Sequence, residues 1–169
     1  MKHYSLDNFM ADTRAAVALA AEPADCVEAV APLLHRLING RLNNGQADFL
    51  QPQHLRTCAG AYARNPMHID PDGGPSLYAL VWTPGQWTPI HDHGADSGID
   101  LRRGGPILLG EGTVTTFVPN PDHIHKTGVP DERPQVVSLH LYGHTMNAFH
   151  VYDVEAGTRE RIDVFHNES

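Results

Sequence analysis

The chain has 169 residues, of which 41% are apolar and 19% charged, and this length predicts a single domain. Its 12 lysines and arginines are outnumbered by 20 aspartates and glutamates, and a net charge of −8 without a basic stripe argues against nucleic acid as a partner. No apolar run approaches the roughly 20 residues of a membrane-spanning helix, and no basic segment precedes the apolar run at 15–21, so we expect a cytoplasmic protein without a membrane partner.

Two helices are predicted at the start of the chain. Apolar side chains recur at helical spacing over residues 6–20, and Ser5 stands at the position of an N-cap. A second apolar stripe covers residues 27–38, with Asp25 as its predicted N-cap. Gly40 predicts the end of this helix, because glycine readily adopts the backbone conformation that follows a helix. The N-terminal part of the chain is therefore expected to be helical.

Strands are predicted over most of the remaining chain. After a short helix at 52–61, apolar and polar residues begin to alternate, and glycine and proline occur every few residues. The predicted strands are 77–82, 88–93, 107–109, 113–118, 123–127, 136–142, 148–154 and 160–165. Many short strands with close turns are typical of a sandwich or a barrel. We therefore expect a mostly β protein, a β-barrel with the helices packed outside and with Trp82 and Trp87 as packing residues.

Histidine is unusually abundant, with 12 residues in the chain, and it is the commonest metal ligand in proteins. Two pairs with one residue between the histidines lie on predicted strands, His91 with His93 and His123 with His125. Residues two apart on a strand share a face, so the rings of a pair can converge on one ion while Asp92 faces the other way. Two such pairs are harder to obtain by chance than one, and we expect a metal site.

The type of ligand restricts the metal. Neutral imidazoles without thiolates suit iron, zinc, nickel or copper, and a set of three leaves positions open for substrate and O2 when the ion is Fe(II). The nearest carboxylate after the first pair is Asp96, an alternative ligand. Cys26 and Cys58 lack metal-binding or disulfide spacing and are interpreted as reduced thiols. Further histidines without partner spacing are interpreted as structural or surface residues: His35, His54, His68, His144, His150 and His166.

Four segments of the chain resemble a known family. Residues 84–94, with the sequence PGQWTPIHDHG, resemble the first metal motif of the cupin superfamily and, within it, the cysteine dioxygenase family of thiol dioxygenases. Three more segments agree with that family in order: YARN at 62–65, IHK at 124–126 and SLHLY at 138–142. The similarity covers roughly residues 62–153, more than half of the chain. It implies one cupin domain over 1–169, a jelly-roll β-barrel at 62–169 with an N-terminal helical cap at 1–61.

The resemblance also implies a metal and its ligands. It implies that His91, His93 and His125 bind Fe(II) as the cofactor. His123 shares a strand face with His125, but the family's ligand stands directly before a basic residue, here Lys126, so His123 is expected outside the site.

Substrate and chemistry follow from the same resemblance. Arg64 is implied to bind the substrate carboxylate and Tyr142 to hydrogen-bond near substrate and oxygen, with Ser138 and His140 orienting Tyr142. The implied activity is that of an oxidoreductase of cysteine metabolism, which adds both atoms of O2 to the thiol of L-cysteine and forms cysteine sulfinate. Read without the resemblance, Arg64 is a surface charge, and Tyr142 and His140 are residues of the core.

Other functions remain as alternatives. The same machinery would serve 3-mercaptopropionate or mercaptosuccinate, and a different class is a non-catalytic metal-binding cupin that acts as a ligand sensor or storage protein. A zinc or nickel cupin isomerase or hydrolase is a third interpretation. We expect a monomer or a weak homo-oligomer whose partners are a small thiol carboxylate and O2.

Two departures from the family bear on these expectations. Neither cysteine lies shortly after the first histidine pair, so we expect no cysteine–tyrosine crosslink in the site. The span from His93 to His125 is only 125 − 93 = 32 residues, and it lacks a strand segment that members of the family carry. Either a segment is missing from the sequence between His93 and Ser97, or a true deletion leaves the barrel open beside the metal.

Overall fold

The computed structural model describes residues 4–40, 47–93, 105–118, 123–144, 146 and 148–163. The chain divides into two compact units, one of residues 1–50 with 100–118 and one of residues 51–99 with 119–169. The division of a single cupin domain into a cap and a barrel at residue 61 stays a prediction. Within the described residues, no helix is both long enough and apolar enough to cross a membrane.

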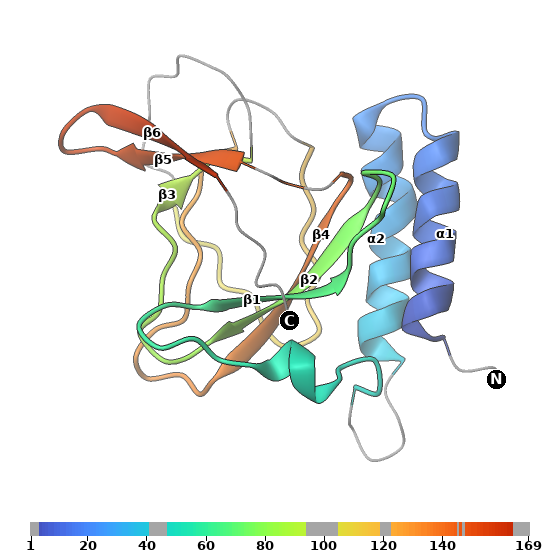
Figure 1. Ribbon diagram of the computed structural model, residues 1–169, viewed down its shortest axis with the longest axis horizontal. Helices are drawn as coiled ribbons and strands as arrows, with labels where there is room; N and C mark the ends of the chain where they lie inside the picture. The colour runs from blue at the N-terminus through green and yellow to red at the C-terminus, as the bar shows by residue number, and fades with distance from the viewer. Residues whose placement is uncertain are drawn as a thin grey trace. The chain divides into compact units, whose positions relative to one another are not determined.

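Two helices form the regular part of the first unit, α1 (Leu6–Leu19) and α2 (Pro23–Asn39), which lie side by side in Figure 1. The predicted N-cap of α1 is confirmed, because Ser5 Oγ accepts a hydrogen bond from Asn8 N at 3.2 Å. The predicted apolar stripe is also confirmed, since Phe9 is fully buried in this helix. Helical spacing alone was enough to predict α1.

The second helix starts earlier than the sequence pattern predicted. Its N-cap is Glu22 and its first residue is Pro23, a position where the missing N–H of proline costs nothing. The predicted cap, Asp25, lies inside the first turn, where its side chain accepts a hydrogen bond from Glu22 N at 3.3 Å. The end at Gly40 is confirmed.

The second unit contains a short 3-10 helix and two three-stranded antiparallel sheets. The helix, η1, is Pro52–Leu55, shorter than the predicted 52–61. The strands are β1 (Ala63–His68), β2 (Ser76–Trp82), β3 (Ile90–His91), β4 (Val136–Tyr142), β5 (Ala148–Asp153) and β6 (Thr158–Asp163). The strand orders are β1-β2-β4 and β3-β5-β6. No closed barrel is formed by the strands that the structure describes.

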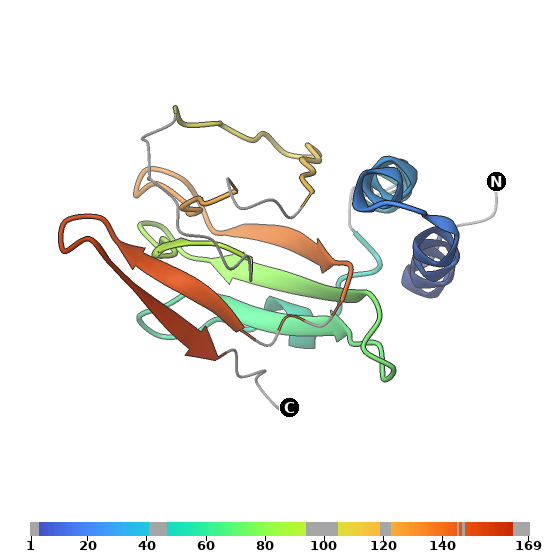
Figure 2. The ribbon, with the colours of Figure 1, turned by 90° about the horizontal axis from the view of Figure 1, so that it is seen from above.

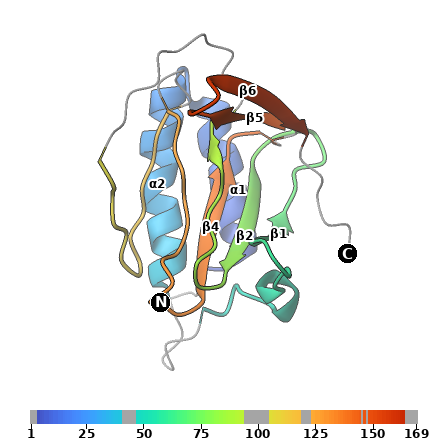
Figure 3. The same ribbon diagram turned by 90° about the vertical axis from the view of Figure 1, so that its left-hand side faces the viewer.

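The first sheet is built around β2, which lies between β1 and β4 (Figure 3). Every residue of β2 is buried. Leu80 pairs with Arg64 on β1 and with Ser138 on β4, while Tyr78 pairs with His140. Directly paired residues of antiparallel strands lie on the same face, and so do residues two apart. Arg64, Tyr78, and the alternate residues of β4 that were predicted to be functional therefore share one face of this sheet.

The second sheet carries the first histidine motif on its shortest strand. β3 has two residues, and β5 pairs with it on one side through Ile90–Tyr152 and His91–Val151. β5 also pairs with β6 to form the hairpin drawn in red in Figure 2. Two isolated antiparallel bridges add to this pairing and join Trp87 to Gly128 and His91 to His125. These bridges bring the two His-x-His segments together.

The turn before β3 directs the chain into this pairing. Gly85 has a φ of 78°, a backbone conformation that glycine adopts without strain. Gly85 N donates to Val129 O at 3.0 Å, and Val129 N donates to Gln86 O at 2.9 Å. The turn is thereby held against the segment that leads back from the second histidine pair.

Several predicted strands are wrong or shortened. Residues 107–109 and 113–118 form no strand, and Ile107 and Leu108 are 82% and 80% exposed, because no neighbouring strand pairs with them in the described structure. The predicted strand at 88–93 is reduced to β3, and 123–127 to a bridge at His125.

One strand and one tryptophan also differ from expectation. β1 was not predicted. It contains Pro66, and proline is tolerated here because β1 lies at the edge of its sheet. Trp82 is 1% exposed, as a packing residue should be, whereas Trp87 is 46% exposed, which contradicts the prediction for it. Lys126 covers the Trp87 ring, with Nζ 5.3 Å from its centroid.

Candidate metal centre

His91 and His125 are brought together by backbone pairing between distant parts of the chain. His91 N donates to His125 O at 2.9 Å, and His125 N donates to His91 O at 3.0 Å. Residues that exchange both hydrogen bonds across antiparallel strands lie directly opposite each other, with their side chains on one face. The two ring centroids are accordingly 4.7 Å apart. The pairing presents one imidazole from each segment at the same place.

His93 completes a cluster of three imidazoles. It follows His91 by two residues, and its ring centroid is 5.3 Å from that of His91 and 4.9 Å from that of His125. One nitrogen from each ring lies within 4.8 Å of the other two. A metal bound about 2 Å from each nitrogen holds the nitrogens roughly 3 Å apart, and rotation of the side chains covers the difference. The three histidines can therefore hold one metal ion.

The local hydrogen bonding of His91 fits metal binding. Its Nδ1 lies 3.0 Å from Pro89 O, and a carbonyl oxygen only accepts, so Nδ1 must carry the proton. The lone pair of Nε2 is then available for a metal, and the ring orientation is fixed by the second hydrogen bond. The donor set of three neutral nitrogens suits a transition-metal ion that prefers imidazole.

The cluster stays neutral at physiological pH. Burial, followed by the charges of the neighbouring imidazoles, lowers the pKa of His93 to about 3. The same two causes lower the pKa of His125 to about 4. Burial also lowers the pKa of His91, although Pro89 O and Asp92 oppose the shift. A metal therefore meets deprotonated ligands and displaces few protons when it binds.

His123 lies beside this cluster. Its ring centroid is 5.2 Å from that of His125 and 6.5 Å from that of His93. It does not belong to the group whose nitrogens converge within 4.8 Å. The alternative ligand Asp96 lies outside the described residues, as does the junction between His93 and Ser97 where a segment would be missing.

Arg64 and Tyr142, the predicted substrate residues, lie together on the face of the first sheet. The Arg64 guanidinium carbon is 3.8 Å from the centroid of the Tyr78 ring and 5.6 Å from that of Tyr142. Arg64 also hydrogen-bonds the Tyr142 side chain. The Tyr142 ring centroid is 6.0 Å from that of His93. The phenol therefore adjoins the histidine cluster, and the guanidinium adjoins the phenol.

Ser138 and His140 form a hydrogen-bonded chain behind Tyr142. Ser138 Oγ lies 2.9 Å from His140 Nε2, and Trp82 Nε1 donates to the same Oγ at 2.8 Å. The His140 and Tyr142 ring centroids are 6.4 Å apart, in a tilted arrangement. Burial lowers the pKa of His140 to about 4, and the positive charge of Arg64 adds to the shift. His140 is thus a neutral, oriented imidazole.

Burial also controls the protonation of the tyrosines. It raises the pKa of Tyr142 to about 12, against the opposing effect of Arg64. Burial raises the pKa of Tyr62 in the same way. The Tyr62 ring stacks on that of Trp82 at 4.6 Å between centroids. Tyr142 therefore remains a hydroxyl that can donate a hydrogen bond near neutral pH.

Sequence reasoning missed two residues that support this face. Tyr78 is fully buried under the Arg64 guanidinium, and Trp82 bonds Ser138 besides packing. The signal was the alternation of Tyr78 and Trp82 along a strand, which places both on one face. Neither contact was predictable, because each depends on which strand pairs with β2.

No protein-family model matches this chain. The similarity to cysteine dioxygenases consequently stands on the motifs themselves. What the chain carries is a group of three histidines in its β-rich unit that can hold a metal ion, in an arrangement consistent with a cupin-like metal site.

Proposed function

We propose that the chain is a thiol dioxygenase that uses Fe(II), with L-cysteine as the first choice of substrate. The observation that carries the proposal is the convergence of His91, His93 and His125 next to the phenol of Tyr142, which in turn lies beside the guanidinium of Arg64. The corresponding fold is a cupin barrel with an N-terminal helical cap. The antiparallel bridge between His91 and His125, which places the two metal segments side by side, supports it.

The reaction would convert a thiolate and O2 into a sulfinate, with both oxygen atoms ending on sulfur. Fe(II) held by three imidazoles would supply the reactivity with O2 and favour the thiolate form of the substrate. Arg64 would bind the substrate carboxylate through its planar fork, a contact that lysine does not reproduce. Tyr142, kept protonated by its pKa of about 12, would donate a hydrogen bond to bound substrate or oxygen.

The neighbours of these two residues are suited to hold them in place. The Tyr78 ring contacts the guanidinium of Arg64, whose carbon lies 3.8 Å from the ring centroid, and limits its movement. On the same face of the sheet, hydrogen bonds from Trp82 to Ser138 and between Ser138 and His140 fix the His140 ring near Tyr142. The residues that would contact substrate are thus preorganised by packing that is already present.

Oxygen consumption by iron-loaded protein tests the proposal. With L-cysteine, we expect O2 uptake and formation of one sulfinate per O2, and no product under anaerobic conditions. Comparison with 3-mercaptopropionate and mercaptosuccinate identifies the preferred thiol. Binding of thiols without O2 uptake would indicate a sensor instead, and activity that persists without oxygen would indicate a hydrolase or isomerase.

An arginine variant tests the assignment of the carboxylate contact. A charge-assisted bidentate contact in a partly desolvated site contributes about 2 to 4 kcal/mol, or roughly 30-fold to several-hundred-fold in kcat/KM. Arg64→Ala should therefore lose that factor on cysteine and change little on cysteamine, which lacks the carboxylate. Arg133→Ala, which removes the same charge from an exposed position of the same unit, is the control. Wild-type kcat/KM on cysteine in Arg64→Ala would show that the carboxylate is held elsewhere.

A further inference from the structure

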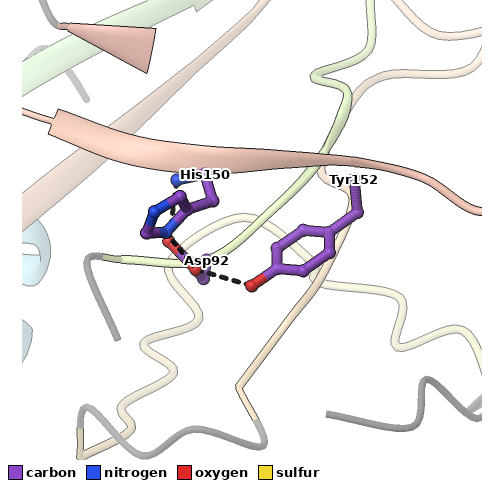
Figure 4. Close-up of polar contacts among 3 residues, drawn as sticks. All are labelled: Asp92, His150 and Tyr152. Atoms are coloured by element: carbon purple, nitrogen blue, oxygen red, sulfur yellow. Dashed lines mark hydrogen bonds and ion pairs between the residues drawn. The ribbon is translucent and has the colours of Figure 1, made fainter. Parts of the chain in front are cut away.

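The residue between the first two histidines has a set of contacts that the proposed function does not use. Asp92 is 1% exposed, and its carboxylate accepts hydrogen bonds from two residues of β5 (Figure 4). His150 N donates to Oδ1 at 2.9 Å, and Tyr152 Oη donates to Oδ2 at 2.8 Å. His150 Nδ1 lies 3.0 Å from Oδ2, and because a carboxylate only accepts, Nδ1 is the donor. Three donors thus converge on one buried side chain.

These contacts lie on the face opposite to the metal cluster. His91 pairs with Val151, and its ring meets Phe149 at 5.5 Å between centroids. His150 alternates with these residues along β5 and therefore points to the other face, where it meets Asp92. None of the donors to Asp92 is a member of the histidine cluster. Asp92 can therefore orient the rings of His91 and His93 only through the backbone of residues 91–93.

The backbone between His91 and His93 has little regular strand pairing to hold it in place. Regular pairing in β3 ends at His91, so His93 lies beyond the ladder that orients its neighbour. The main-chain bond from Asp92 N to His150 O, 3.1 Å long, and the carboxylate contacts extend the attachment to β5 by one residue. Because successive side chains of a strand alternate, a rotation of the chain at Asp92 would turn both adjacent imidazoles away from their common point.

The strength of the attachment follows from burial. A buried carboxylate must have its lone pairs satisfied, and hydrogen bonds to a charged acceptor are roughly twice as strong as neutral ones. All three donors come from β5, which is itself paired with β6 along its length. The Asp92 side chain is therefore tied to a strand whose position is set independently of β3.

We propose that Asp92, held by His150 and Tyr152, is a positioning residue for the metal centre: it sets the backbone between His91 and His93 so that their imidazoles converge with His125. The inference rests on the proposed function only in requiring that the cluster binds a metal. Asp92 itself touches neither metal nor substrate in this arrangement.

Titration of the full-length protein with Co(II) tests the proposal without turnover. Co(II) binds similar donors to iron, and its visible absorption reports the geometry of the ligands. Asp92→Asn keeps the size of the side chain but replaces one acceptor oxygen with an NH2 donor. That NH2 group would face another donor, either the backbone N–H of His150 or the side chains of His150 and Tyr152. A partner that hydrogen-bonds a metal-ligating histidine directly contributes about 10- to 100-fold to metal affinity. Because Asp92 acts on the ligands through the backbone, a loss of about tenfold, at the lower end of that range, follows for this variant. We expect that loss together with a changed Co(II) spectrum.

Two further variants separate positioning from general destabilisation. Tyr152→Phe removes a single hydroxyl and should weaken Co(II) binding less than Asp92→Asn, with a spectral change in the same direction. Asp153→Asn is the matched control, since it lies on the same strand and accepts hydrogen bonds from Glu155 N and Ala156 N in the β5–β6 turn. It should leave the affinity and the spectrum unchanged. If Asp92→Asn fails to fold, Tyr152→Phe decides the question by itself.

The possible failures are distinguishable. If the wild-type protein binds no Co(II), the proposed metal function fails and the positioning role fails with it. If the wild-type protein binds Co(II) and folded Asp92→Asn and Tyr152→Phe retain its affinity and spectrum, only the positioning role is overturned. Equal losses in the Asp153→Asn control would also overturn it, because they would show a non-specific effect on the hairpin.

Discussion

Metal binding by the three-histidine cluster should weaken by less than about tenfold between pH 7.5 and pH 5.5, far less than three ordinary histidines would allow. An imidazole must be neutral to bind a metal, so protons compete with the ion below the pKa of the ligand. The pKa of His93 is lowered to about 3 and that of His125 to about 4. Because both values lie below the tested range, these two rings remain neutral throughout it.

The expected magnitude follows from the neutral fraction of each ring. A histidine with the ordinary pKa of about 6.5 is about 9% neutral at pH 5.5, so three such ligands would weaken binding by about 1000-fold relative to pH 7.5. With a pKa of about 3 and about 4, His93 and His125 each lose less than about a tenth of their neutral form. His91, whose pKa is also lowered, loses less than the roughly tenfold of an ordinary histidine. The total loss should therefore stay below about tenfold.

The assay is competition for Co(II) with a chelator of known pH-dependent affinity, at both pH values and constant ionic strength. Circular dichroism of the metal-free protein at each pH is the control for folding. A loss approaching 1000-fold in protein that is folded at pH 5.5 would refute the reasoning, since it would mean that the cluster titrates like exposed histidines.

Three further predictions concern individual side chains. The pKa of His140 is lowered to about 4 in the folded protein, so the folded state binds a proton on this ring less readily than the unfolded state does. The stability that the neutral His140 ring contributes is therefore complete above pH 6.5 and is lost as the pH falls toward 4. Urea unfolding of the metal-free protein should lose about 2 kcal/mol from this group between pH 8 and pH 5, and His140→Gln should lose correspondingly less. Elemental analysis should find no bound iron in His125→Ala and near wild-type iron in His123→Ala; the reverse would move the third ligand to His123. Tyr78→Phe keeps the aromatic ring beneath Arg64, whereas Tyr78→Leu removes a ring contact worth about 0.5 to 2 kcal/mol. Tyr78→Leu should therefore raise KM for cysteine roughly 2- to 30-fold relative to Tyr78→Phe. Equal KM values in the two variants would contradict this prediction.

The local sequence determined α1, β4 and the side of the strand to which each residue of the first histidine pair points. Helical spacing with Ser5 as cap predicts α1, and β4 begins and ends where alternation predicted it, at Val136 and Tyr142. The facing of His91 and His93 to one side, and of Asp92 to the other, follows from the two-residue period of an extended chain. These features depend on residues a few positions apart, so the chain near each one is sufficient to specify them.

Only the tertiary structure decided which extended segments become strands. The apolar run at 107–109 resembles a strand in sequence but pairs with no strand in the described structure. β1 contains Pro66 and forms at the edge of its sheet. A strand is stable only when another strand satisfies its backbone groups, and the partner is far away in sequence. Local composition carries no information about that partner.

Tertiary structure likewise determined which histidines form the metal centre. The sequence presented two histidine pairs, and the backbone bridge between His91 and His125 selects which imidazole of the second pair meets the first. The convergence of His150 and Tyr152 on Asp92 depends on the register of β5 against β3. A shift of that register by one residue would turn every side chain of β5 to the opposite face, so no pattern within either segment could have specified these contacts.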